Sequence, residues 1–417
     1  MANRFNEKLR HSALNPKEFK LLPSLLLLVI LPMIATDIYL PVVPQIGKEF
    51  GANGSGLTNT LSAYMLGYSL SLLAAGIFAD MYGRRAVAII GLTLFFLSSI
   101  GCFFAAKVDQ LIIWRFFQAF GGGCGTLIAR IIVRDTYDLK TQVKVLSYLA
   151  MGIVASPILG PTLGAYISDA FGWRSIFLFL ACFSLLAVIF LCLYLHESLP
   201  DADSNMQYRF KEIFLRCCKL WTHREFVFNT LVISFAWGIY FTFISSSPFL
   251  IQNLYQFGVI EYGYIFSATV CGFVLGAIFI RWKIATLDLK SLIFIAGAIV
   301  FFSTLGLFLF IKLGVESLEA LLFFVFAALF GIGIIFPATQ AGVTKPFKKD
   351  IGLISGVFYS TEMFFGAICG YVISCMDVIN WHGSSLVMLV ASICILFLLA
   401  LDKSLPKFFP KKIFEKV

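Results

Sequence analysis

Three ionisable side chains, Asp37, Arg115 and Glu362, lie inside long apolar runs of the sequence. Placing such a group in a bilayer costs roughly 2.5–3.5 kcal/mol on insertion scales, so a group retained there indicates a function by default. Buried carboxylates suit proton coupling or binding of a charged solute. None of the four histidines lies within an apolar run, so we expect carboxylates to carry any proton coupling.

Asp37 and Arg115 lie at comparable depths. Asp37 lies about 25 Å beyond Lys20 at roughly 1.5 Å per residue, and Arg115 lies roughly 9 Å into a helix that enters from the outside. One interpretation is an ion pair that orients two helices, and the other is a water-filled cavity shared with a substrate. Both interpretations place the two side chains on inward faces.

Glu362 lies near mid-depth, roughly 18 Å into a helix that enters from the cytoplasm. No basic residue of the same half of the chain lies at that depth. An unpaired buried carboxylate should stay protonated until its surroundings change. This predicts a proton site or a cationic-substrate site, and the alternative is a neutral glutamate bonded to a neighbouring helix.

The elements that must position these groups are membrane helices. The chain of 417 residues is 59% hydrophobic and 13% charged, with a mean hydropathy of +0.90. A bilayer core of about 30 Å needs roughly 20 apolar residues per helix, and backbone groups in lipid must bond internally. We predict twelve spans, near 21–41, 57–79, 86–106, 109–129, 145–168, 173–195, 226–251, 262–280, 291–311, 319–341, 351–376 and 383–401.

The spans fall into six and six, which predicts an all-α membrane protein of two six-helix bundles. We expect the first span to be a retained helix and not a cleaved signal peptide. The expected segments are a cytoplasmic N-terminus (1–20), an N-terminal bundle (21–195), a cytoplasmic linker (196–225), a C-terminal bundle (226–401) and a cytoplasmic C-terminus (402–417).

Positive charge gives the orientation. Of the 32 Lys and Arg residues, 27 lie in the termini and alternate loops, four lie in the opposite loops, and Arg115 lies within a span. By the positive-inside rule, both termini and the linker are cytoplasmic. We therefore predict a multi-pass protein of the bacterial inner membrane. The net charge of +9 is topological, and nucleic acid is not a predicted partner.

Other functional classes lack their signals. The ten cysteines show no metal-ligand or disulfide spacing, and no Walker A loop is present. The spans contain no histidine cluster and no nucleophile paired with a base, so we predict no enzyme activity, no metal and no cofactor apart from protons as the coupling ion. The expected partners are the lipid bilayer and a small-molecule substrate, and we expect a monomer.

The link between the second and third spans combines Gly76, Asp80, Gly83, Arg84 and Arg85. Glycines allow a tight turn, and the carboxylate and arginines can form a charge network that latches one conformation. Ordinary topogenic charge would explain the arginines but not the spacing of the glycines and the aspartate.

The fifth span carries Gly152, Gly160 and Gly164 on one face, with Pro157 and Pro161 on the same stretch. Small residues let a neighbouring helix approach closely, and prolines remove backbone donors and bend the helix. The pattern predicts a seal between the two halves, although generic helix packing would also explain the glycines.

Gly76–Arg85 resembles the loop signature of the major facilitator superfamily, G-x-x-x-D-x-x-G-R-R/K. Arg115–Gly121 resembles the family's fourth-helix motif with Ala119 in place of a glycine, and Gly152–Ala165 resembles the fifth-helix motif of antiporters. The corresponding link in the second half, Arg281–Asp288, lacks the glycine and aspartate spacing, so a second latch there would be degenerate.

Three further segments, Asp37–Pro41, Ala129–Asp135 and Ser246–Phe249, are similar to the Bcr/CflA type drug-resistance transporters. The resemblance implies two bundles around a central site that opens alternately to each side. It also implies that helices one, four, seven and ten line the cavity, with Asp37 and Arg115 in it. The other expected lining residues are Tyr39, Tyr64, Tyr68, Gln118, Tyr240, Ser246 and Tyr359.

Together these patterns predict a proton-coupled transporter that exports small amphipathic molecules, including drugs, with Asp37 and Glu362 as protonation sites. The same architecture could instead import a nutrient, exchange a metabolite or carry a siderophore. A sensor that binds its ligand without transporting it is a further alternative.

Overall fold

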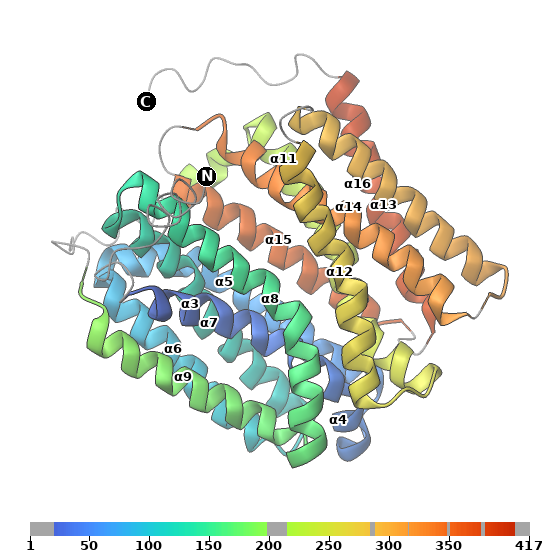
Figure 1. Cartoon of the computed structure of the whole chain (residues 1–417), viewed down its shortest axis with the longest axis horizontal. Helices are drawn as coiled ribbons and strands as arrows, with labels where there is room; N and C mark the ends of the chain where they lie inside the picture. Colours follow the sequence, from blue (N-terminus) through green and yellow to red (C-terminus); the bar gives the residue numbers. More distant parts are fainter. Residues whose placement is uncertain are drawn as a thin grey trace, which may run out of the picture.

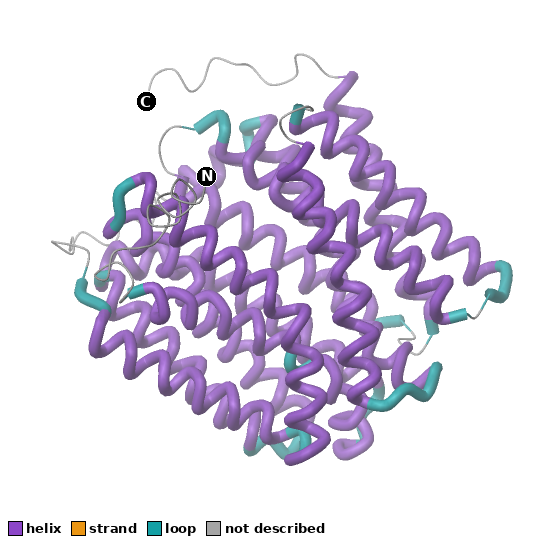
Figure 2. Tube along the Cα trace, viewed as in Figure 1, coloured by secondary structure: helices purple, strands orange, loops and turns teal. Residues whose placement is uncertain are grey.

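The structure is a computed structural model that describes residues 21–197, 215–283, 288–315, 317–347, 351–376 and 380–404. Regular structure within these ranges is helical throughout (Figure 2). The predicted N-terminus (1–20), most of the linker (198–214) and the end of the C-terminus (405–417) lie outside the described residues.

The described helices follow one another in a simple up-and-down order along the chain. Their bounds are α3 (Leu22–Asp37), η1 (Leu40–Val42), α4 (Val43–Phe50), α5 (Gly54–Tyr82), α6 (Arg84–Phe103), α7 (Val108–Thr136), α8 (Leu139–Phe171), α9 (Arg174–Tyr194), α11 (Arg224–Phe249), η2 (Leu250–Leu254), α12 (Val259–Lys283), α13 (Leu289–Lys312), α14 (Leu318–Thr344), α15 (Ile351–Ser374) and α16 (Trp381–Ser404).

Within the described ranges, twelve helical stretches are long and apolar enough to cross a membrane, and each overlaps one of the predicted spans. The number of spans and the all-α class are therefore confirmed. The first span extends further than predicted, because the chain continues beyond Asp37 through η1 and α4 to Phe50. Pro41 and Pro44 lie in the first turns of η1 and α4, where their missing N–H groups break the helix and allow it to restart.

Helix neighbours repeat between the two halves. In the first half α5 packs on α7, and α6 packs on α7 and α9. In the second half α12 packs on α14 in the same way, and α13 packs on α14 and α16. Figure 1 shows the two groups, coloured blue to green and yellow-green to red, on either side of the molecule. The structure thus consists of two six-helix bundles with equivalent packing.

Two seams join the bundles, one between α5 and α15 and one between α8 and α12. At the first seam, the hydroxyls of Ser69 and Ser360 each donate to the other residue's backbone carbonyl at 2.8 Å. At the second seam, the Ser267 hydroxyl donates to the Ile158 carbonyl at 2.7 Å. Small polar side chains therefore connect the halves across both seams.

The glycine face of α8 rests on the first membrane helix and on the turn that follows it. A Cβ added to Gly160 would lie 2.6 Å from the Cβ of Asp37, and one added to Gly164 would lie 2.1 Å from the Ile38 carbonyl oxygen. Elsewhere on α8, Pro161 lies close to Gly263 of α12. Helix α8 therefore lies between the first membrane helix and the opposite bundle.

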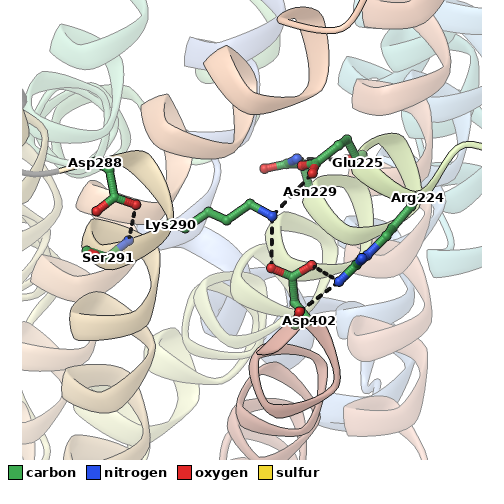
Figure 3. A network of polar contacts seen from close by, with 7 residues as sticks. All are labelled: Arg224, Glu225, Asn229, Asp288, Lys290, Ser291 and Asp402. Atoms are coloured by element: carbon green, nitrogen blue, oxygen red, sulfur yellow. Dashed lines mark hydrogen bonds and ion pairs between the residues drawn. The ribbon is translucent and has the colours of Figure 1, made fainter. Parts of the chain in front are cut away.

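A charge network ties together three helices of the second half, where α11 and α13 begin and α16 ends (Figure 3). The Asp402 carboxylate accepts from Arg224 at 2.8 Å and from Lys290 at 3.0 Å, and Lys290 also reaches Glu225 at 3.2 Å. Beside it, hydrogen bonds from Ser291 cap α13 and hold the pKa of the Asp288 carboxyl below its usual range.

This network differs from the latch expected in the second half by analogy with the first. It uses none of the residues of the link after α12, and all of its described members belong to one bundle. Because each contact joins helices of the same half, the network stabilises that half as a unit and makes no contact across a seam.

We predict that Gly164→Ala destabilises the protein by about 1–3 kcal/mol, because the new methyl group overlaps the Ile38 carbonyl and α8 must move away. Gly56→Ala on α5 is the matched control, since its Cβ would meet only Val108 at 3.7 Å. Thermal unfolding in detergent should show a lower midpoint for the first variant alone. Equal unfolding midpoints for Gly164→Ala and Gly56→Ala would show that α8 does not pack as described.

Candidate functional site

Arg115 belongs to α7, and its guanidinium is buried in a cage formed by two aromatic rings from other segments. Its guanidinium lies 4.6 Å from the ring centroid of Tyr39 and 4.0 Å from that of Tyr64. One of its terminal nitrogens, Nη1, donates to the Ala35 carbonyl at 3.0 Å and to the Gln118 side-chain oxygen at 2.7 Å. Ring quadrupoles and oxygen acceptors thus offset the cost of burying this charge.

Further hydrogen bonds hold the cage in place. They join Tyr39 to Thr60 (2.9 Å), Tyr64 to the Pro32 carbonyl (2.6 Å) and Gln118 to Ser99 (2.8 Å). The Nε and Nη2 atoms of Arg115 have no hydrogen-bond partner among the described residues. Arg115 therefore retains two donor nitrogens that another group could use.

Asp37 ends α3 and is 6% exposed. Its carboxylate accepts a hydrogen bond of 2.6 Å from Ser156 on α8. The described residues contain no ion pair between Asp37 and Arg115, so the structure does not bring these two groups into contact. Instead, the second bundle brings Tyr240 and Tyr262 within electrostatic range of Asp37. Asp37 thus lies beside the other half.

Glu362 is completely buried on α15, and neither of its carboxylate oxygens has a hydrogen-bond partner among the described residues. The ionisable groups within its electrostatic range are Arg130 of α7, Tyr68 of α5 and Tyr359 of its own helix. The neutral, hydrogen-bonded glutamate considered above is not what the structure shows. Its surroundings come largely from the opposite bundle.

Arg130 is the residue near Glu362 that the sequence did not identify as a site residue. Its guanidinium lies 4.6 Å from the ring centroid of Tyr359. Tyr68 lies in the same cluster and donates to the Thr126 hydroxyl at 3.0 Å. We counted Arg130 among the topogenic charges, because it lies near the end of a span and beside other basic residues. No local pattern in the sequence indicates that it faces α15.

One turn beyond Glu362, α15 makes close contact with α11. A Cβ added to Gly366 would lie 2.8 Å from the indole nitrogen of Trp237, which has no hydrogen-bond partner among the described residues. Ser246, which we expected to line the same region, donates to the Thr242 carbonyl of its own helix. The contact between α11 and α15 therefore contains an unpaired indole N–H one helical turn along the chain from Glu362.

The remaining expected lining residues divide between these clusters. Tyr39, Tyr64 and Gln118 surround Arg115, whereas Tyr68 and Tyr359 belong with Arg130. Tyr240 of α11 lies within electrostatic range of Asp37 from the opposite bundle. Among the described residues, no group of three or more His, Cys, Asp or Glu side chains could hold a metal ion.

The link between α5 and α6 forms a charge network. Arg84 pairs with Asp80 at 2.6 Å and with Asp135 of α7 at 3.4 Å. Gly83 adopts a φ of +89°, and the backbone N–H groups of Arg84 and Arg85 donate to Glu197 at 2.8 and 3.0 Å. The open N-terminus of α6 thus binds a carboxylate that follows α9.

Asp135, Glu197 and Ser156 are contact residues that the sequence reasoning did not single out. Asp135 lies in a segment used only for family resemblance, and Ser156 lies inside the fifth-span motif without belonging to its glycine and proline pattern. Glu197 follows the sixth span at a distance of more than a hundred residues from Arg84. Only the packing of helices brings these residues to their partners.

A family model described as Major Facilitator Superfamily matches residues 25–370. An uncharacterized transporter of Rickettsia felis is 28% identical over 361 residues, which cover 84% of this chain and 88% of that protein. Multidrug resistance protein MdtL of Escherichia coli is 32% identical over 243 residues, which cover 58% of this chain and 61% of MdtL. The match to MdtL thus spans about three fifths of that protein.

Solved structures share the fold at low sequence identity. A POT family transporter in complex with a thioalcohol conjugated peptide superimposes with a TM-score of 0.73 at 14% identity, over 93% of this chain and 96% of that one. The fold, the twelve spans and the match over most of the sequence agree. The chain therefore belongs to the Major Facilitator Superfamily of membrane transporters.

Proposed function

We propose that this transporter exports small amphipathic organic molecules from the cytoplasm and that inward proton flow drives the export. The observation that carries the proposal is the pair of buried carboxyl groups, Asp37 and Glu362, neither of which contacts a cationic side chain within the described part of the chain. A carboxyl group without a fixed cation can take up and release a proton as its surroundings change.

The similarity to MdtL supports a drug-like cargo, since that protein's name gives its function as multidrug resistance. Aromatic side chains surround the three ionisable groups, and aromatic rings pack well against planar or apolar organic molecules. Tyr240 and Tyr262 approach Asp37, and Tyr68 and Tyr359 approach Glu362. Both carboxyl groups could therefore meet a substrate that is partly apolar.

The charge asymmetry supports an orientation with both termini and the linker in the cytoplasm of a bacterial cell, and the protein in its inner membrane. With twelve spans, the chain ends on the side where it begins. On this orientation the link at Asp80 and Arg84 and the network at Asp402 both face the cytoplasm. The two carboxyl groups then lie at different depths, Glu362 near the middle of its helix and Asp37 in the outer half of the membrane.

The seams support alternating access, in which the two bundles rock against each other around a central site. Helix α8 presents its glycine face to the helix of Asp37 and also contacts α12 of the opposite half. Movement at the α8 and α12 seam would therefore change the surroundings of Asp37 directly. This is how the fifth-span motif would couple conformation to protonation.

Everted membrane vesicles test the proposal with a panel of fluorescent amphipathic compounds. An imposed proton gradient should drive uptake of at least one compound, and a protonophore should abolish it. Asp37→Asn and Glu362→Gln together should reduce gradient-driven uptake at least about tenfold, because amide side chains cannot take up and release the proton that drives export.

Tyr148→Phe, at an exposed position of α8, is the control and should leave uptake unchanged. A membrane-impermeant thiol reagent should label Cys218 in these vesicles and not in intact cells, which checks the orientation. Uptake that survives both the protonophore and the double substitution would overturn the coupling scheme. Gradient-driven flux in the opposite direction would identify an importer instead.

The network around Arg84 should act as a latch for one conformation. Asp80→Asn removes its 2.6 Å ion pair with Arg84 and should lower uptake about two- to fivefold, since a partly exposed pair is worth about 0–1 kcal/mol. Asp109→Asn, an exposed carboxylate at the start of α7, should leave the rate unchanged. Equal rates for wild type and Asp80→Asn at matched expression would show that the network is only topogenic.

A further inference from the structure

Arg130 forms a contact between the two bundles. It belongs to α7 of the first half, whereas Tyr359 and Glu362 belong to α15 of the second half. Its guanidinium lies 4.6 Å from the Tyr359 ring centroid. The charge of one half is therefore held by an aromatic ring of the other.

Glu362 lies next to the position that Arg130 occupies. It is three residues beyond Tyr359, which places both side chains on one helix face, separated by ~4.5 Å along the axis. Arg130 lies within electrostatic range of Glu362, yet the described residues include no ion pair between them. The long, flexible side chain of Arg130 can move from Tyr359 to Glu362, one turn along α15, when one half rotates slightly against the other.

The energies of the two contacts favour different states of the carboxyl group. A cation over an aromatic ring is held by the ring quadrupole, and this contact needs no charge on a neighbouring group. An ionised carboxylate buried without a partner is far more costly, and a guanidinium is the cation best suited to pair with it. Arg130 therefore binds Tyr359 more favourably while Glu362 is neutral. Once Glu362 is ionised, Arg130 binds Glu362 more favourably.

The surroundings of Glu362 leave Arg130 as its natural counter-ion. Among the described residues, α5 contributes Tyr68, α7 contributes Arg130, and α15 contributes Tyr359 as the charged or titratable groups within range. Helix α11 contributes the indole of Trp237 near Gly366, which carries no charge. No other described cation competes for the carboxylate.

We propose that Arg130 is a two-position switch across the α7 and α15 contact, resting on Tyr359 in the state described here and pairing with Glu362 in the opposite state of the transport cycle. This inference rests on the proposed proton-coupled transport, because it makes the charge of Glu362 select the conformation. It assigns Arg130 a positioning role and places it in no direct contact with the cargo.

The test measures the conformational equilibrium directly and needs no knowledge of the cargo. Spin labels at Tyr148→Cys on α8 and Ile278→Cys on α12, both exposed positions on the two sides of the second seam, report the distance between the bundles by pulsed electron paramagnetic resonance. The native cysteines are replaced in this variant so that only the two introduced cysteines carry a spin label. The purified full-length protein in lipid nanodiscs provides the ratio of the two conformers.

A double-mutant cycle then gives the prediction. Tyr359→Leu should shift the ratio away from the conformer described here by about two- to fivefold, the worth of one cation–π contact. Glu362→Gln should shift it toward that conformer by at least as much. Neither Tyr359→Leu nor Glu362→Gln should shift the ratio when Arg130→Gln is also present. If Arg130→Gln does not fold, Arg130→Met takes its place. Tyr359→Phe, which keeps the ring, should shift it less than Tyr359→Leu.

Two outcomes would overturn the switch. One is an unchanged ratio in both Tyr359→Leu and Glu362→Gln, and the other is shifts that persist undiminished without the Arg130 guanidinium. These results would leave proton-coupled export untouched, since that is measured as flux in vesicles. Conversely, an importer or uncoupled carrier would fail the vesicle assay while the cycle could still show the switch.

Discussion

The cost of burying charge in an apolar interior is the constraint on which this structure depends. Arg115 meets it with two aromatic rings and two oxygen acceptors, and Asp37 meets it with a single serine hydroxyl. Glu362 has no hydrogen-bond partner among the described residues. A well-satisfied group fixes a local structure, whereas an unsatisfied group gives a proton or a conformational change something to act on. Arg115 is thus the best compensated of the three groups, although its Nε and Nη2 atoms have no partner among the described residues, and Glu362 is the least compensated.

Helix packing decides which of these groups can sense the opposite half. The glycine face of α8 brings that helix against Asp37, and α8 in turn contacts α12 across a seam. Glu362 lies beside the other seam, where α5 and α15 exchange hydrogen bonds through Ser69 and Ser360. Each carboxyl group therefore lies next to a surface where the bundles meet. Arg115, by contrast, is enclosed within the first bundle.

The sequence predicted the spans well, because hydropathy and loop charge are local signals that add along the chain. It did not predict the contacts of Asp37 and Arg115, since equal depth does not give the rotation of a helix about its axis. It also missed Arg130, whose place near the end of a span looks the same whether it faces water or α15. Glu197 was missed because its partner, the N-terminus of α6, is distant in sequence. Local patterns thus specify the elements, and the packing between elements specifies the site.

Difference infrared spectroscopy on the purified protein tests most directly whether Asp37 and Glu362 exchange protons. Acid titration should produce carbonyl stretching bands of protonated carboxyl groups in apolar surroundings. Asp37→Asn should remove one component of these bands and Glu362→Gln another, while the double variant lacks both. Spectra of the variants that match the wild type would contradict the claim that these two carboxyl groups carry the coupling protons.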